Sequence, residues 1–266
     1  MSSRVQEKER LRAEREAREA ERQAGQRRQR LWLLGGVAAL AIVIVAVAIA
    51  VSSGGSSSSN TPKAGQGAQG GAEVAARFKG IPQHGIELGN LKARVTMVEL
   101  ADLKCPVCDG YMRSAFPTLV DRYVRTGKVK MVMQLQTFVG ESSAPGDSER
   151  AARMALAAGL QNKLWNFSDV FYLNQGDETA SYVTNGFLTK LGSAVPGLDT
   201  SKALSQRGSA GVTNELQQAD ALFNKYGFTG TPSFLLGKQG RLSPFTPSSF
   251  NDPAAYSGSI DKLLGQ

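Results

Sequence analysis

The hydrophobic positions divide the chain into a polar start, one long apolar run and a longer segment of short mixed patterns. Residues 31–51 are 21 residues without a charged side chain. A helix of that length is about 31 Å long, which matches the hydrocarbon core of a bilayer. We therefore predict a charged tail (1–30), one transmembrane helix (31–51), a Gly/Ser-rich flexible linker (52–72) and one folded domain (73–266).

The charges on either side of the apolar run predict its orientation. Three of the four residues at 27–30 are arginine, whereas Lys63 is the first basic residue beyond the run. By the positive-inside rule the tail is cytoplasmic and the domain extracytoplasmic, which predicts a single-pass protein of the cell membrane in contact with the lipid bilayer. A cleaved signal peptide is the alternative, because residues 48–50 have the A-x-A form. In both cases the domain lies outside.

Within the domain, strand-like and helix-like patterns alternate, which is typical of an α/β fold. Strands are predicted at 94–100, 128–139 and 234–237. Helices are predicted at 107–124, 147–160, 163–173, 179–191, 199–207, 211–226 and 260–264. The central five of these helices predict a helical insertion at about 147–222.

A few aromatic residues and the only histidine add to this picture. Trp165, Phe167, Phe171 and Tyr172 are predicted to form the core of the insertion, with a peptide-binding groove as the alternative. His84 is predicted to lie in a turn. With one histidine in the chain, a Ser-His or Cys-His catalytic site would have to depend on that residue.

Composition excludes several classes of function. The net charge is +8, but residues 1–30 contribute +4 and Lys63 +1, so that the domain carries only +3. A nearly balanced domain does not indicate a nucleic-acid partner. Two cysteines exclude a disulfide-rich scaffold and a four-cysteine zinc site.

Both cysteines lie in one motif, Cys105-Pro-Val-Cys108, between the first predicted strand and the helix that follows it. Cys105 is predicted at the helix N-terminus, with Pro106 at the first helical position. The partial positive charge of a helix N-terminus favours a thiolate there. Lys104 is expected to add to this effect if its ammonium turns toward the sulfur.

Thiol–disulfide exchange is the chemistry that this placement favours. A structural staple is one alternative, although a ring this small gains only about 2 kcal/mol. A zinc site would need ligands besides His84, and no metal site is predicted. A soft-metal carrier could recruit Met112, which has the spacing of a core residue.

Two segments resemble the membrane-tethered, extracytoplasmic DsbA-like branch of the thioredoxin superfamily. VELADLKCPVC (98–108) is similar to the active-site segment of that family, and YGFTGTPSF (226–234) to its loop with a cis proline. Residues 151–227 resemble its helical insertion, and 80–83 and 88–89 its first strands. The resemblance implies a thioredoxin-like α/β fold with an inserted helical subdomain, preceded by one transmembrane helix.

The resemblance also implies roles for single residues. Cys105 would be the attacking nucleophile and Cys108 the resolving cysteine. Glu99 would be the buried carboxylate that relays a proton to the resolving thiol, with a strand residue at a sheet edge as the alternative. Thr231 and a cis Pro232 would face the disulfide and border the substrate groove.

One departure from the family affects the expected strength of oxidation. Val107 stands beside Cys108, where the strongest oxidants of the family have a histidine. The missing imidazole removes one donor to the thiolate, so the reduced form is expected to be less favoured.

The sequence thus predicts an extracytoplasmic thiol–disulfide oxidoreductase that introduces disulfides into secreted or membrane proteins. It would need no cofactor beyond the redox-active disulfide between Cys105 and Cys108, and a quinone-linked membrane oxidase would regenerate it. Alternatives are an isomerase or reductase of the envelope, a membrane-tethered peptide-binding module without catalysis, and a metal carrier.

Overall fold

The computed structural model describes residues 67–139, 146–238 and 240–265. The predicted tail and transmembrane helix, and most of the predicted linker, lie outside these residues. No helix in the described ranges is both long enough and apolar enough to cross a membrane.

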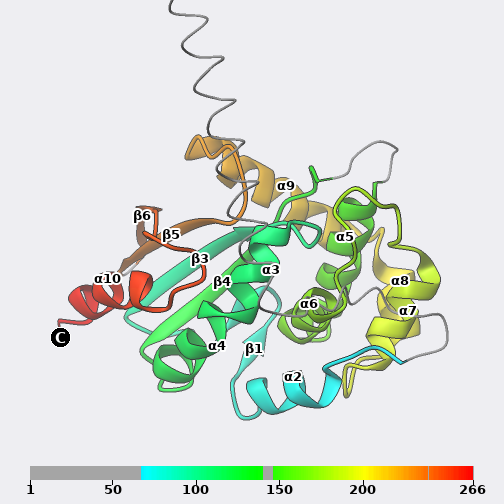
Figure 1. Ribbon diagram of the computed structural model, residues 1–266, viewed down its shortest axis with the longest axis horizontal. Coiled ribbons are helices and arrows are strands. Elements are labelled where there is room, and N and C mark those ends of the chain that lie inside the picture. The colour runs from blue at the N-terminus through cyan, green and yellow to red at the C-terminus, as the bar shows by residue number, and fades with distance from the viewer. Residues whose placement is uncertain (1–66, 140–145, 239, 266) are drawn as a thin grey trace, which may run out of the picture. The chain divides into compact units, whose positions relative to one another are not determined.

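The described residues contain one mixed sheet of six strands in the order β1-β2-β4-β3-β5-β6 (Figure 1). The strands are β1 (Gln83–His84), β2 (Glu87–Leu88), β3 (Val95–Ala101), β4 (Val129–Leu135), β5 (Ser233–Lys238) and β6 (Arg241–Phe245). β3 and β4 are parallel, whereas β5 is antiparallel to β3. Strand β3 therefore lies in the centre of the sheet, with Val98 opposite Val132 on one side and Leu235 on the other.

Helices cover both faces of this sheet and form the insertion. They are α2 (Gly71–Phe78), α3 (Pro106–Arg113), α4 (Ala115–Leu119), the π-helical turn η1 (Val120–Val124), α5 (Asp147–Gly159), α6 (Leu164–Leu173), α7 (Asn185–Ser193), α8 (Thr200–Gln206), α9 (Ala210–Lys225) and α10 (Ala254–Leu264). Helices α5 to α9 lie between β4 and β5 in the chain, which confirms the predicted helical insertion.

The alternation of side chains along β3 separates two apolar clusters. Met97 and Ala101 belong to the main core, together with residues of α3, α4 and α10. Val98 and Leu100 face the other side, where Leu222 of α9 packs against them. A residue at position 99 therefore faces the main core, on the same side as the helix that begins after Cys105.

The helix predicted over 107–124 is not continuous. It is interrupted at Ser114, which ends α3 with φ −115° and ψ −69°, and the remaining residues are divided between α4 and η1. Pro117 lacks an N–H group, so the carbonyl of Arg113 has no helical partner there. The recurrence of apolar positions persists through the break, which is why the pattern alone did not reveal it.

Other boundaries also differ from the predictions. The helix predicted at 179–191 begins at Asn185, because the amides of Tyr182 and Val183 donate to the carboxylate of Asp147 instead. His84 lies in strand β1 rather than in a turn. Helix α2 begins at Gly71, within the last two residues of the predicted linker, and strand β6 was not predicted.

The aromatic residues of α6 are buried, which excludes them from an open peptide groove. Trp165, Phe167, Phe171 and Tyr172 are each at most 1% exposed. The prediction of a core is confirmed, but that core is not confined to the insertion. The ring of Trp165 stacks on that of Phe116 in α4, with centroids 5.5 Å apart and planes 4° from parallel.

Candidate active site

The cysteine motif lies where the central strand leads into α3, as the sequence predicts. β3 ends at Ala101 and α3 begins at Pro106, with Cys105 as the N-cap residue. The N–H of Cys105 donates to the carbonyl of Asp102 at 3.0 Å, and the carbonyl of Cys105 accepts from Asp109 at 3.1 Å. The first of these bonds closes the turn, and the second starts the helix.

A buried carboxylate that the sequence analysis missed holds this turn. One oxygen of Asp102 accepts from the N–H of Lys104 at 2.9 Å and from the hydroxyl of Ser148 at 2.6 Å. The other accepts from the N–H groups of Phe138 at 3.1 Å and Val139 at 3.0 Å. The bond to Lys104 is an Asx-type contact visible in the sequence, but the other three come from distant segments.

The two cysteines are thiols in this structure and differ in their surroundings. Cys105 is 6% exposed and Cys108 is fully buried. A hydrogen bond with Cys108, helped by the backbone N–H groups of Val107 and Cys108, outweighs burial and lowers the pKa of Cys105 to about 6. Burial raises the pKa of Cys108 well above its ordinary value, and its bond with Cys105 adds to this.

Glu99 lies inside the main core, beneath the cysteines. It pairs with Met133 on β4 and Phe234 on β5, so it is not at a sheet edge, and that alternative is wrong. Within the described residues, neither of its carboxylate oxygens has a hydrogen-bond partner. Burial, followed by the negative charge of the Cys105 thiolate, raises its pKa to about 8. The carboxyl group is therefore mostly protonated at neutral pH.

The loop before β5 closes the site from the other side. The peptide bond between Thr231 and Pro232 is cis. The Cys105 thiol donates to the carbonyl of Thr231, with 3.3 Å between sulfur and oxygen. Pro106 is exposed, and Val107 is 44% exposed at the mouth of the site.

The expectation for Lys104 is wrong. Its side chain is buried, and its ammonium donates to the carbonyl of Ala180 at 2.7 Å rather than turning to the sulfur. It also lies 3.6 Å from the carboxylate of Asp147 and 5.1 Å from the ring centroid of Tyr182. Lys104 therefore connects the active-site turn to the insertion.

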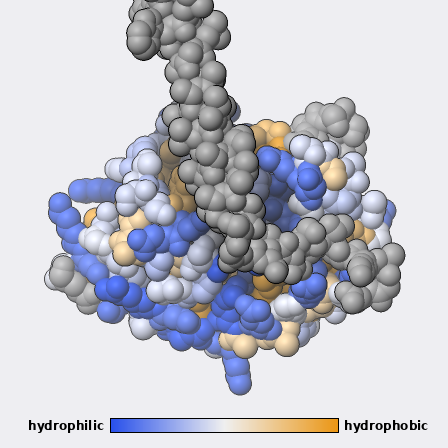
Figure 2. Space-filling view, in the orientation of Figure 1, coloured by the Kyte–Doolittle hydropathy of each residue, from blue (hydrophilic) through white to orange (hydrophobic). Residues whose placement is uncertain are grey.

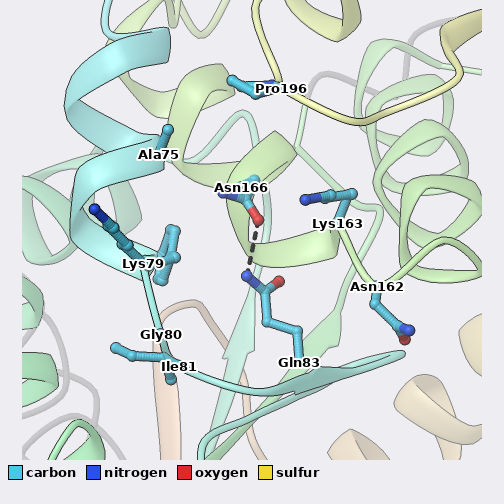
Figure 3. A pocket seen from close by; sticks show the side chains of 10 residues that line it. Ala75, Lys79, Gly80, Ile81, Gln83, Asn162, Lys163, Asn166 and Pro196 are labelled. Carbon is cyan, nitrogen blue, oxygen red and sulfur yellow. Dashed lines mark hydrogen bonds between the residues drawn. The ribbon is translucent and has the colours of Figure 1, made fainter.

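One cavity, the possible metal ligands and Met112 add no reactive group to the site. A cavity of about 310 Å³ between α2 and α6 is lined by Lys79, Lys163 and the hydrogen-bonded pair Gln83 and Asn166, but by no cysteine (Figure 3). Among the described residues, no three His, Cys, Asp or Glu side chains are grouped so as to hold a metal ion. Met112 is fully buried in the main core.

The unequal thiols predict a selective, pH-dependent reaction. In the reduced protein, Cys105 should be alkylated by iodoacetamide with a half-maximal rate near pH 6, whereas Cys108 should stay unmodified. Cys108→Ala should move that midpoint upward, because its thiol contributes most to the low pKa of Cys105. A midpoint between pH 8 and 9 in the unmodified sequence, the range of an ordinary thiol, would contradict the geometry.

The buried carboxyl group of Glu99 should make the stability of the reduced protein depend on pH. The folded dithiol form holds this proton up to about pH 8, whereas the unfolded chain releases it near its ordinary pKa. Folding therefore loses stability as pH rises between these values, by roughly 1 kcal/mol per pH unit. Glu99→Gln removes this loss, so its stability relative to the unsubstituted reduced protein should grow from pH 5 to pH 8 in urea unfolding. A constant difference across that range would show that Glu99 is already ionised in the folded protein.

Comparison with known proteins agrees with this geometry. A family model described as thioredoxin matches residues 83–252. The probable disulfide bond formation protein D of Bacillus cereus is 27% identical over 147 residues, which are 55% of this chain and 67% of that protein. The crystal structure of oxidised BdbD from Bacillus subtilis has a TM-score of 0.59 at 21% identity, covering 70% of this chain and 98% of that chain. A thioredoxin-like oxidoreductase from Silicibacter pomeroyi DSS-3 has a TM-score of 0.53 at 28% identity, covering 72% and 98%. The chain therefore belongs to the thioredoxin family and is one of its DsbA-like members, the class of protein thiol–disulfide oxidoreductases.

Proposed function

We propose that this protein introduces disulfides into secreted or membrane proteins, with Cys105 and Cys108 as its redox-active pair and no other cofactor. The observation that carries the proposal is the asymmetry of the two thiols, of which only Cys105 has a lowered pKa. A thiolate that exists only in the reduced protein stabilises that form. When the reduced form is favoured, the disulfide form gives up its bond readily and acts as an oxidant.

In the proposed cycle the oxidised protein takes two electrons from a pair of substrate thiols. A substrate thiolate attacks the sulfur of Cys105 and breaks its bond to Cys108, which leaves a mixed disulfide at Cys105 and a thiolate at Cys108. The second substrate thiolate then attacks the substrate sulfur of the mixed disulfide and releases Cys105 as a thiolate. Of the two substrate protons, one balances the proton taken up by Cys108 and the other goes to solvent.

Glu99 is the proposed proton donor to Cys108 in the first step. The Cys108 thiolate is a poor leaving group because burial raises its pKa, so a nearby acid speeds its departure. A carboxyl group with a pKa of about 8 carries the required proton at neutral pH. Solvent returns the proton to Glu99 after each cycle.

The surface around the turn suits an extended, partly unfolded substrate. Hydrophilic side chains cover much of the face shown in Figure 2, with smaller hydrophobic areas between them. Val107 and Phe138 are large apolar side chains that are 44% and 46% exposed. Phe138 lies beside the active-site turn because its N–H donates to Asp102, and its ring packs on Phe223 with centroids 5.6 Å apart. Thr231 and Pro232 border the same groove in this proposal.

The proposed place of action is outside the cell membrane. It rests on the apolar run at 31–51, taken as an uncleaved anchor in the bilayer, and on the arginines that precede it. Disulfides persist in extracytoplasmic compartments, which favours oxidation over reduction. A quinone-linked membrane oxidase is the proposed partner that restores the disulfide between Cys105 and Cys108.

A trapping experiment tests the proposal. Cys108→Ala removes the thiol that can attack the mixed disulfide at Cys105 and expel the substrate, so mixed disulfides at Cys105 should last longer in cells and be released by reductant on a diagonal gel. Cys105→Ala, which keeps the other cysteine, is the matched control and should trap nothing. Glu99→Gln with both cysteines present should oxidise a dithiol peptide more slowly at pH 7 than the unsubstituted protein.

The outcomes separate the alternatives. Trapped secreted or membrane proteins would support the proposal, and trapped cytoplasmic proteins would overturn the proposed location. No trapped protein at all would overturn the exchange mechanism. In that case, peptide binding that survives replacement of both cysteines by alanine would indicate a binding module.

A further inference from the structure

The end of α6 and the segment that follows it contact every residue of the turn between β3 and α3. The side-chain amide of Gln175 donates to the carbonyl of Leu103 at 2.7 Å and to that of Cys105 at 3.2 Å. The hydroxyl of Tyr172 donates to the carbonyl of Asp102 at 3.3 Å. With the bond from Lys104 to Ala180, the insertion thus binds residues 102, 103, 104 and 105 in succession.

The two bonds from Gln175 differ from those that build the turn. The turn is already closed by the bond from Cys105 to the carbonyl of Asp102, and the Asp102 carboxylate already holds the N–H of Lys104. Gln175 adds a brace between two carbonyls on either side of Lys104. The Cys105 carbonyl is also the acceptor of the bond from Asp109 that starts α3.

We infer that Gln175 is a positioning residue for Cys105: its amide braces the carbonyls of Leu103 and Cys105 and so holds the start of α3 with its N–H groups aimed at the Cys105 sulfur. The N–H groups of Val107 and Cys108 favour the Cys105 thiolate. Their direction depends on how the first residues of α3 are oriented. The Cys105 carbonyl belongs to the peptide group that joins Cys105 to Pro106, directly before the two peptide groups that carry these N–H groups.

This inference deepens the proposed function, and it rests on that function only where it concerns the oxidising strength of the cysteine pair. Loss of the brace makes the N–H groups less well aimed, so the Cys105 thiolate is less stable. A less stable thiolate makes the reduced protein less favoured, which makes the disulfide a weaker oxidant. Gln175 would then set the oxidising strength of the pair from outside the motif.

Gln175→Met tests this in the full chain, because it keeps much of the side-chain stem and removes both donors. We expect the midpoint of the thiolate absorbance of Cys105 to rise. We also expect the equilibrium with glutathione to shift threefold to tenfold toward the oxidised protein, as the loss of one or two hydrogen bonds implies. A tenfold shift corresponds to about 30 mV for this couple.

Two further variants make the result decisive. Gln175→Glu replaces the donor by a carboxylate and should raise the thiolate midpoint further than Gln175→Met. Gln161→Ala is the matched control, because Gln161 is also half-buried but bonds to the backbone of Asp199 within the insertion, at 3.0 Å. It should leave the midpoint and the equilibrium unchanged.

A purely structural role would give a different pattern. If Gln175→Met lowers the melting temperature but leaves the thiolate midpoint and the glutathione equilibrium as they are in the unsubstituted protein, the inference is wrong. The midpoint does not depend on substrates. Suppose that Gln175→Met shifts the thiolate midpoint as expected, but Cys108→Ala traps no protein. That pair of results would overturn the proposed function and leave the role of Gln175 intact.

Discussion

The buried carboxylate of Asp102 is the point on which the active-site region depends. Its two oxygens accept four hydrogen bonds, from the turn itself, from the segment after β4 and from the start of α5. This one side chain therefore joins the turn after the central strand to the helical insertion. Because burial raises the pKa of Asp102 while its four donors lower it, the charge is costly to keep, and the donors are what stabilise it.

The two neighbouring thiols of the site differ in their surroundings and therefore in their protonation. Cys105 lies at the end of the turn, where the N–H groups of α3 reach its sulfur, whereas Cys108 lies one helical turn deeper in the core. Glu99 faces the same core from the central strand. The fold thus places a stabilised thiolate, a thiol and a protonated carboxyl group in succession from the surface inward. This order of protonation states suits a pair that receives electrons at Cys105 and a proton at Cys108.

Local patterns predicted the parts of the site that adjacent residues determine. A β-rich segment, two cysteines around a proline and a helical repeat were sufficient to place Cys105 at the N-terminus of α3. The loop with Pro232 was predicted from the resemblance of residues 226–234 to the DsbA-like family. The contacts that depend on distant segments were not predictable. Lys104 turns to Ala180, and Gln175 reaches back over about 70 residues of chain to the turn. No spacing in the sequence indicates either contact.

The same distinction between local and distant contacts explains the errors in the predicted helices and strands. The periodicity of 107–124 reports which side chains face the core, and it continues through the break at Ser114 because the buried face does not change. Strand β6 has no buried apolar face to reveal it. It pairs closely with β5 at Gly237, where a side chain would collide with the carbonyl of Arg241. The glycine was visible in the sequence, but its close neighbour was not.

The reduction potential of the pair formed by Cys105 and Cys108, measured in the full chain against glutathione buffers and read by alkylation, tests the central claim most directly. A protein that donates disulfides, with its Cys105 thiolate stabilised in the reduced state, should have a potential between about −120 and −180 mV. A value of about −270 mV would contradict this account, because the disulfide form of such a pair is more stable than the disulfides of its substrates and the pair works as a reductase.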